Sequence, residues 1–394
     1  MDANWNTQGD AVFRGGGVKG LGLAGALLGF YEHRDKPIKE WVNVAGASAG
    51  AIIASYLACG HDAPDMVELL KDTKFGQFQD FPFGGEILGG GLNLIGRRHG
   101  LAHGTVFRNW LSKELKQQTF AATKSGDRYR LKLIAVDVTN RALLVLPDDL
   151  PRYRRPGESA PIDPDAFEIA DAARMSMSIP YFFEPIELAR DRVRITHQGN
   201  GGYAVDDVVD RLDVQQTNER LREQSRQEVA FAEIKDESLL MSSIIDGGTL
   251  SNFPVWLFDV DPNVAGDPDQ PDVKGPQRMT FGFTLTGGRG VGAGFNEAVK
   301  HLPWLFRFGF DIFHTAQEAW DARFVSHSTR VRTVTVDAGT VGTTDFNLSV
   351  QLQEMLVENG RQAAIEFLDA FDPEQYVNTY HARPPAAAPV AAHA

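Results

Sequence analysis

Residues 41–50 read WVNVAGASAG and decide the fold, because an apolar strand turns directly into a helix there. Residues 41–45 are mostly apolar and rich in valine, which is typical of a buried strand in a parallel sheet. Residues 49–58 are apolar, rich in alanine and free of proline, which predicts a tightly packed helix. A serine, Ser48, therefore stands at a predicted strand–helix junction.

The spacing of Gly46, Ser48 and Gly50 is that of a nucleophile elbow. In such a turn the serine hydroxyl is pushed outward, and the glycines let neighbouring backbone come close. The start of the following helix favours negative charge that develops beside the serine. The alternative is structural: Ser48 caps the helix, and the small residues serve close packing. Ser48 is thus a candidate nucleophile.

A second glycine motif lies near the N-terminus, where residues 14–20 read RGGGVKG between an apolar start and a helix-like run. Successive glycines expose backbone N–H groups that can bind an anion. A phosphate-binding P-loop is excluded, because Lys19 is followed by Gly20 instead of Ser or Thr. A dinucleotide-binding fingerprint matches only weakly, at Gly15, Gly17 and Gly20. An oxyanion hole explains this motif and the elbow together.

A third motif, IIDGG at residues 244–248, contains a carboxylate. Asp246 follows a β-branched run, so we expect it at the C-terminal edge of a strand, where α/β sheets place their sites. The alternative is an ordinary Asp-Gly turn.

These three motifs, in this order, resemble those of the patatin-like phospholipase family. Residues 246–254 match the family pattern D-G-G-x-x-x-N-x-P. Residues 133–139 resemble its second core strand, and residues 172–183 resemble its small-residue helix that ends at proline and an aromatic residue. The resemblance covers roughly residues 10–370 and is specific because the motifs occur together. Arg14 departs from the family, which more often has a small residue before the glycines.

The resemblance implies a three-layer α/β/α fold, with a mostly parallel central sheet and helices on both faces. The alternation of strand-like and helical runs along the chain favours the same class. It also implies a Ser–Asp dyad, in which Ser48 is the nucleophile and Asp246 its base. The implied oxyanion hole consists of the backbone amides of Gly15, Gly16, Gly17 and Val18. No metal and no organic cofactor is expected.

Two alternatives for the proton acceptor stay open. Asp137 is a second carboxylate at a strand end, but valines flank it on both sides, which favours a structural role. A Ser–Asp–His triad would need a histidine after Asp246. The candidates are His301, His314 and His327, and none lies in a loop signature.

The length of 394 residues and a hydrophobic content of 43% predict one α/β domain with a sizeable core, over residues 1–381. An exposed insertion is expected at about 197–243, because residues 206–229 are strongly charged and helix-prone. Residues 147–164 are predicted to form a surface loop. The Ala- and Pro-rich segment 382–394 is predicted to be a disordered tail. Further predicted helices are 63–71, 106–119, 297–313 and 348–371.

The net charge of −13 argues against nucleic acid as a partner. The same charge repels an anionic membrane, so any contact with a membrane surface is expected to be local and transient. The first residues lack a signal-peptide pattern, and no run approaches about twenty apolar residues. We therefore expect a cytoplasmic protein, although a non-Sec secretion route leaves no trace in the sequence. The single cysteine, Cys59, excludes an internal disulfide.

Two aromatic clusters bear on the substrate. Residues 75–83 contain four phenylalanines in a glycine-containing segment, and residues 304–313 contain a second group. A place in the core is the default for both, and an acyl-chain groove is the alternative for the first. The sequence therefore predicts a serine hydrolase of lipid esters, with phospholipids or neutral glycerides as substrates. The alternative is a lipid-binding or effector protein whose activity needs an activator. The oligomeric state cannot be inferred from the sequence.

Overall fold

The computed structural model describes residues 7–81, 100–198, 204–258, 279–287, 331–343 and 345–380. Within them the chain forms two compact units. Unit 1 contains residues 7–76 and the described residues from Ser251 onward, and unit 2 contains residues 77–250. The single domain over 1–381 stays a prediction. Several predicted features lie outside the described residues: the helix 297–313, the three histidines, the second aromatic cluster and the tail 382–394.

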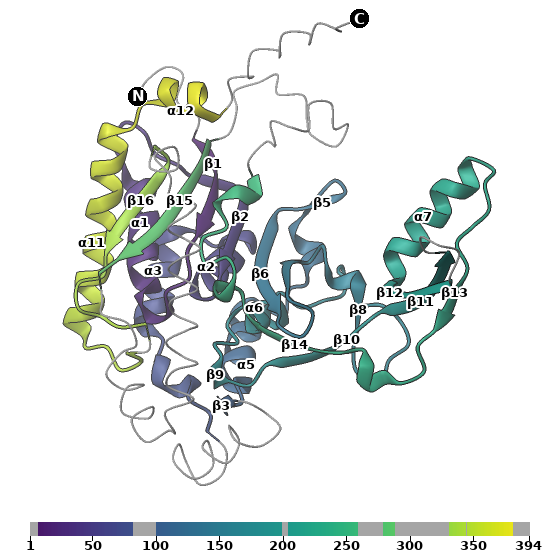
Figure 1. The fold of residues 1–394 in the computed structure, drawn as a ribbon. Helices are drawn as coiled ribbons and strands as arrows, with labels where there is room; N and C mark the ends of the chain where they lie inside the picture. Colours follow the sequence, from purple (N-terminus) through teal and green to yellow (C-terminus); the bar gives the residue numbers. More distant parts are fainter. Residues whose placement is uncertain are drawn as a thin grey trace, which may run out of the picture. The chain divides into compact units, whose positions relative to one another are not determined.

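The strands of unit 1 are all parallel and carry the first two sequence motifs at their ends (Figure 1). In spatial order they are β16 (Thr333–Asp337), β15 (Met279–Thr286), β1 (Gln8–Phe13) and β2 (Glu40–Ala47). On one face of β1, Phe13 stacks on Phe283 with ring centroids 4.9 Å apart. Val12, next along the strand, packs against Phe253 and Val255. Burial on both faces explains why the second half of β1, residues 11–13, is entirely apolar.

Two helices of unit 1 lie side by side, as the purple and yellow ribbons of α1 and α11 show in Figure 1. Glycines allow this close contact, since a Cβ on Gly360 would lie 1.9 Å from the carbonyl oxygen of Gly22. The structure confirms the predicted helices 49–58, 63–71 and 348–371. The helices of this unit are α1 (Gly20–Glu32), α2 (Ala49–Ala58), α3 (Ala63–Asp72), α11 (Val350–Ala370) and α12 (Pro373–Tyr380).

Unit 2 differs from unit 1 because its main strands run antiparallel to their neighbours. They are β7 (Ala142–Leu146), β6 (Leu131–Asp137), β14 (Met241–Asp246), β10 (Ile186–Arg190) and β8 (Tyr153–Arg154). The helix α6 (Ile169–Ser176) packs against β6 and β14, and α5 (Thr105–Glu114) packs against α6. The unit also holds β3 (Gly100–Ala102), β9 (Tyr181–Phe183), β4 (Lys124–Ser125) and β5 (Arg128–Tyr129).

Two predictions for unit 2 are wrong in detail. The segment 147–164 is not entirely a surface loop, because it contains the edge strand β8, in which Tyr153 is buried. The helix predicted over 106–119 ends at Glu114, since Lys116 and Gln117 have φ angles of 51° and 57°, outside the range of an α-helix.

The predicted insertion forms an arm of unit 2 (Figure 1). It consists of the antiparallel strands β11 (Arg192–Gln198), β12 (Ala204–Asp210) and β13 (Phe231–Glu233) with the helix α7 (Arg211–Glu223). The charged stretch 206–229 thus begins as a strand and becomes helical only at Arg211.

An ion-pair cluster ties this arm to β10. Both oxygens of the Asp210 carboxylate accept hydrogen bonds from Arg190, at 2.8 and 2.9 Å, and Arg152 donates a third at 2.9 Å. Burial pushes the pKa of Asp210 up, but the hydrogen bonds and charges of the two arginines outweigh it and hold the pKa below its usual value. The base of the arm is therefore stabilised by an ionised carboxylate.

Candidate active site

Ser48 lies between the end of β2 and the start of α2, at the junction that the sequence predicts. Its backbone adopts φ 54° and ψ −126°, a conformation that non-glycine residues avoid. Such a conformation costs about 1–3 kcal/mol and persists only where the surrounding structure enforces it. Ser48 is 5% exposed, and its side chain makes no capping hydrogen bond with α2. The helix-cap alternative is therefore wrong.

Gly46 and Gly50 hold this turn tight because backbone approaches each of them closely. A Cβ on Gly46 would lie 2.2 Å from the carbonyl oxygen of Gly50. A Cβ on Gly50 would lie 2.3 Å from the carbonyl oxygen of Phe13. Backbone atoms cannot move away as a flexible side chain can, so only glycine fits at either position.

The triple-glycine loop follows β1, and its four amides differ in their partners. The Gly15 N–H donates to the Asn252 carbonyl at 3.0 Å, and the Val18 N–H donates to the Thr343 carbonyl at 3.1 Å. The amides of Gly16 and Gly17 have no acceptor among the described residues. Gly17 has a φ of +57° and begins the 3-10 turn η1 (Gly17–Lys19). Two of the four predicted oxyanion donors are thus engaged with backbone carbonyls.

The glycine loop, Ser48 and Asn252 meet inside unit 1. A Cβ built on Gly15 would lie 2.9 Å from the Cβ of Ser48 and 2.2 Å from Oδ1 of Asn252. Asn252 follows the DGG motif, and sequence reasoning gave it no role in the site. Its place in the pattern D-G-G-x-x-x-N-x-P was the only signal that could have singled it out.

Asp246 ends β14, as predicted, and belongs to unit 2. The residue is 1% exposed, and its Oδ1 accepts a hydrogen bond from the Gly248 N–H at 2.7 Å. The following 3-10 turn η7 (Gly247–Thr249) requires a glycine, because a Cβ on Gly247 would lie 2.1 Å from the Ile134 carbonyl oxygen. Asp246 is thus a buried carboxylate at a strand end. Its pairing with Ser48, which belongs to unit 1, stays a prediction.

Asp137, the competing carboxylate, has several partners inside unit 2. Asn140 donates to both of its oxygens, from its backbone N–H at 2.9 Å and from its side chain at 2.7 Å. The Tyr153 hydroxyl donates at 2.8 Å. Burial, together with the charge of Asp137, raises the pKa of Tyr153. These contacts favour a structural role for Asp137.

Arg174 is a buried cation that sequence reasoning missed. Its guanidinium donates to Oγ of Ser178 at 2.5 Å and to the carbonyl oxygens of His103 and Glu184 at 2.7 and 2.8 Å. Burial lowers its pKa to about 10. The Ser178 carbonyl in turn accepts the backbone N–H of Asp246 at 2.9 Å. Arg174 therefore stabilises the segment around Ser178, to which the backbone of Asp246 is hydrogen-bonded.

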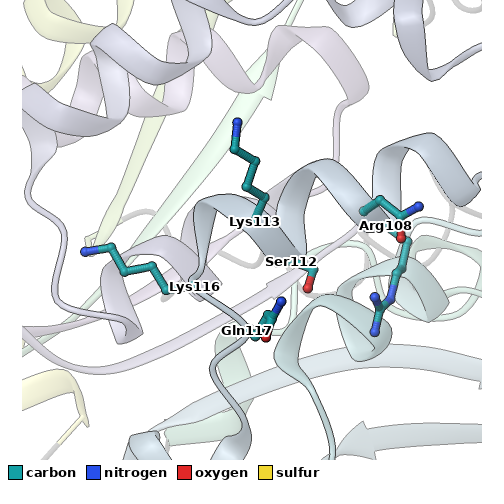
Figure 2. A pocket seen from close by; sticks show the side chains of 6 residues that line it. Arg108, Ser112, Lys113, Lys116 and Gln117 are labelled. Carbon is teal, nitrogen blue, oxygen red and sulfur yellow. The ribbon is translucent and has the colours of Figure 1, made fainter.

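A surface pocket of about 360 Å³ lies along α5 in unit 2 (Figure 2). Its described lining residues are Arg108, Asn109, Ser112, Lys113, Lys116 and Gln117, which include none of the predicted site residues. Arg108 is already paired with Glu168 at 2.9 Å and Asp171 at 2.7 Å. We therefore assign this pocket no ligand.

Two of the three described phenylalanines of the first aromatic cluster belong to the core, and the third, Phe81, is half-buried. Phe75 and Phe78 are buried, and the Phe78 ring lies 5.4 Å from the ring of Phe107 and 5.0 Å from that of Trp110. The predicted acyl-chain groove receives no support from these two residues. Within the described ranges, no cluster of three or more His, Cys, Asp or Glu side chains could hold a metal ion. In the same ranges, no helix has the length and apolarity needed to cross a bilayer.

Comparison with known proteins identifies the family. Residues 11–259 match the family model of patatin-like phospholipases, so the chain belongs to this family. The chain has the α/β fold of the family, with parallel strands in unit 1, antiparallel pairings among the main strands of unit 2, and helices in both units. The family name assigns its members to lipid hydrolysis, and the chain is accordingly a member of a lipid hydrolase family.

Individual proteins are similar to this chain at low sequence identity. The uncharacterized protein YqhO of Bacillus subtilis is 29% identical over 361 residues, which are 91% of this chain and 97% of YqhO. The crystal structure of VipD from Legionella pneumophila is similar at 15% identity and a TM-score of 0.46, over 93% of this chain and 67% of VipD. The type III effector protein ExoU of Pseudomonas aeruginosa is similar at 14% identity and a TM-score of 0.39, over 93% of this chain. The chain spans about half the length of ExoU, 54%.

Proposed function

We propose that the chain is a serine acyl hydrolase of the lipase or phospholipase A type, which cleaves carboxylic esters of lipids through Ser48 and Asp246. The backbone of Ser48 is the observation that carries this proposal. A serine held at φ 54° between two glycines is strained, and strain of this kind is concentrated at functional sites. The motif order and the family provide the substrate class.

The proposed reaction has two halves. Asp246 accepts the hydroxyl proton while Oγ of Ser48 attacks the ester carbonyl, and the leaving alcohol takes the proton away. The amides of Gly16 and Gly17 stabilise the oxyanion, because the amides of Gly15 and Val18 already donate to carbonyls. Water, activated by Asp246, then hydrolyses the acyl-enzyme and releases a fatty acid. This chemistry requires no metal or organic cofactor.

The contacts of Asp137 argue against it as the base and so favour Asp246. Asp137 accepts hydrogen bonds from Asn140 and Tyr153, which would compete with a role in proton transfer. A histidine triad stays the alternative, and its candidates lie outside the described residues. Because lipid esters reside in membranes and micelles, the proposal includes a transient contact with a lipid surface.

Labelling with a fluorophosphonate, followed by mass spectrometry of the peptides, tests the proposal. We expect the label on Ser48 and no label on Ser48→Ala. Ser55→Ala is the matched control, since this buried serine lies in α2, the helix that follows Ser48, and donates to the Ala51 carbonyl. It should label like the wild type. Asp246→Asn should slow labelling by about 10²-fold or more. Label at another residue, or equal ester hydrolysis by Ser48→Ala and wild type, would refute the proposal.

A further inference from the structure

Asn252 has a buried acceptor without a donor. The residue is 5% exposed, and its side-chain Oδ1 has no hydrogen-bond partner among the described residues. The backbone carbonyl of the same residue is satisfied by the Gly15 N–H. A buried acceptor left unpaired costs about 1–3 kcal/mol, so native structures retain few of them. The position of this one indicates why it is retained.

The unpaired acceptor adjoins the proposed nucleophile. A Cβ built on Gly15 would lie 2.2 Å from Oδ1 of Asn252 and 2.9 Å from Cβ of Ser48, so both groups lie close to one point. The Ala47 carbonyl oxygen lies 3.2 Å from that point as well. All three groups belong to unit 1. Hydrogen-bond acceptors thus gather beside the serine that attacks the ester.

The chemistry of a lipid ester limits what can satisfy Oδ1. Both oxygens of an ester are acceptors only, so the scissile group itself has no proton to offer. A hydroxyl on the carbon next to the esterified carbon does. Lysophospholipids and monoacylglycerols carry such a hydroxyl, whereas it is esterified in diacyl phospholipids and triacylglycerols.

We propose that Oδ1 of Asn252 accepts a hydrogen bond from a substrate hydroxyl next to the scissile ester, and that the enzyme thereby prefers partial esters of glycerol. This inference rests on the proposed function. A site with an unpaired polar group discriminates against a substrate that lacks the matching partner, because that substrate leaves the group buried and unsatisfied. For one neutral hydrogen bond the preference amounts to about tenfold in kcat/KM.

Two esters of equal chain length test this preference: 2-hydroxyethyl dodecanoate and 2-methoxyethyl dodecanoate, in which a methyl group caps the hydroxyl. We expect wild type to prefer the hydroxy ester about tenfold in kcat/KM. Asn252→Leu, which keeps the size but removes the acceptor, should bring this ratio close to one. Asn252→Asp keeps an acceptor and should retain the preference. Asn218→Leu is the matched control: Asn218 is also 5% exposed, but its carboxamide pairs with Val229 in the arm.

The outcomes separate this inference from the proposed function. If Asn252→Leu slows both esters equally, Asn252 is structural or positions water, and the inference is overturned. A wild-type ratio near one, with Ser48 labelled and both esters cleaved, overturns the inference alone. If wild type cleaves neither ester and Ser48 takes no fluorophosphonate, the proposed function fails and the inference fails with it.

Discussion

Replacement of Gly50 by alanine should damage both the stability and the reactivity of the protein. Gly50 lies in the first turn of α2, where a methyl group would be 2.3 Å from the Phe13 carbonyl oxygen and 2.8 Å from that of Arg14. These two carbonyls immediately precede the triple-glycine loop. The new methyl group therefore pushes apart the two elements that hold Ser48 and the proposed oxyanion donors.

The size of the effect follows from the contact. A carbon and a carbonyl oxygen need a little over 3 Å, so α2 and β1 must separate by about 1 Å. Overpacking of this kind costs about 1–3 kcal/mol in the free energy of unfolding, and backbone neighbours place it at the upper end. A displacement of about 1 Å between reacting groups costs about 100-fold in rate.

Urea unfolding and the rate of fluorophosphonate labelling measure the two effects. Gly20→Ala is the matched control, because its methyl group would meet only Ala49 Cβ at 3.6 Å and Ile53 Cδ1 at 3.9 Å, ordinary contact distances. Gly20 is helical, so this control should be neutral or more stable by up to about 1 kcal/mol. Wild-type stability and labelling rate in Gly50→Ala would show that the elbow does not pack against β1 as described.

Three further predictions concern unit 2. Asp137→Asn should lower the free energy of unfolding by about 1–3 kcal/mol, because Asn140 and Tyr153 lose a charged acceptor. The folded variant should still be labelled at Ser48. Loss of labelling at unchanged stability would contradict the structural role of Asp137. Arg174→Met should cost about 3 kcal/mol, since it removes the donor of one buried and two half-buried acceptors, and Arg174→Lys should recover part of this loss in urea unfolding. Asp210→Asn should remove a stabilisation that is present above the ordinary aspartate pKa of about 3.9 and is lost as the pH falls through the lower pKa of the folded state. The stability difference from wild type should therefore shrink between about pH 6 and pH 2, and a constant difference would refute the cluster's role.

The sequence predicts well where neighbouring residues determine the structure. The helix over 49–58 has the predicted bounds, and α3 begins at Ala63 as predicted, because Asp62 accepts a capping hydrogen bond from the Asp65 N–H. Ser48 was placed correctly at a strand–helix junction from five residues, since the elbow is a local turn whose glycines are visible in the sequence. By contrast, β8 was missed because a strand of two residues is defined only by its pairing with β10, far away in the sequence.

For the site, the sequence alone was enough to single out Ser48 as the candidate nucleophile and the glycine loop beside it, because each is a short motif with a backbone requirement of its own, and the order of the motifs indicated the family. Only the tertiary structure showed which of the four loop amides already donate a hydrogen bond. The acceptors of two of them belong to Asn252 and Thr343, which lie more than 200 residues further along the chain than the loop. It alone also showed the partners of Asp137 and the unpaired oxygen of Asn252. Hydrogen bonds and close contacts between distant segments follow from packing in three dimensions, so they cannot be predicted from a local sequence pattern.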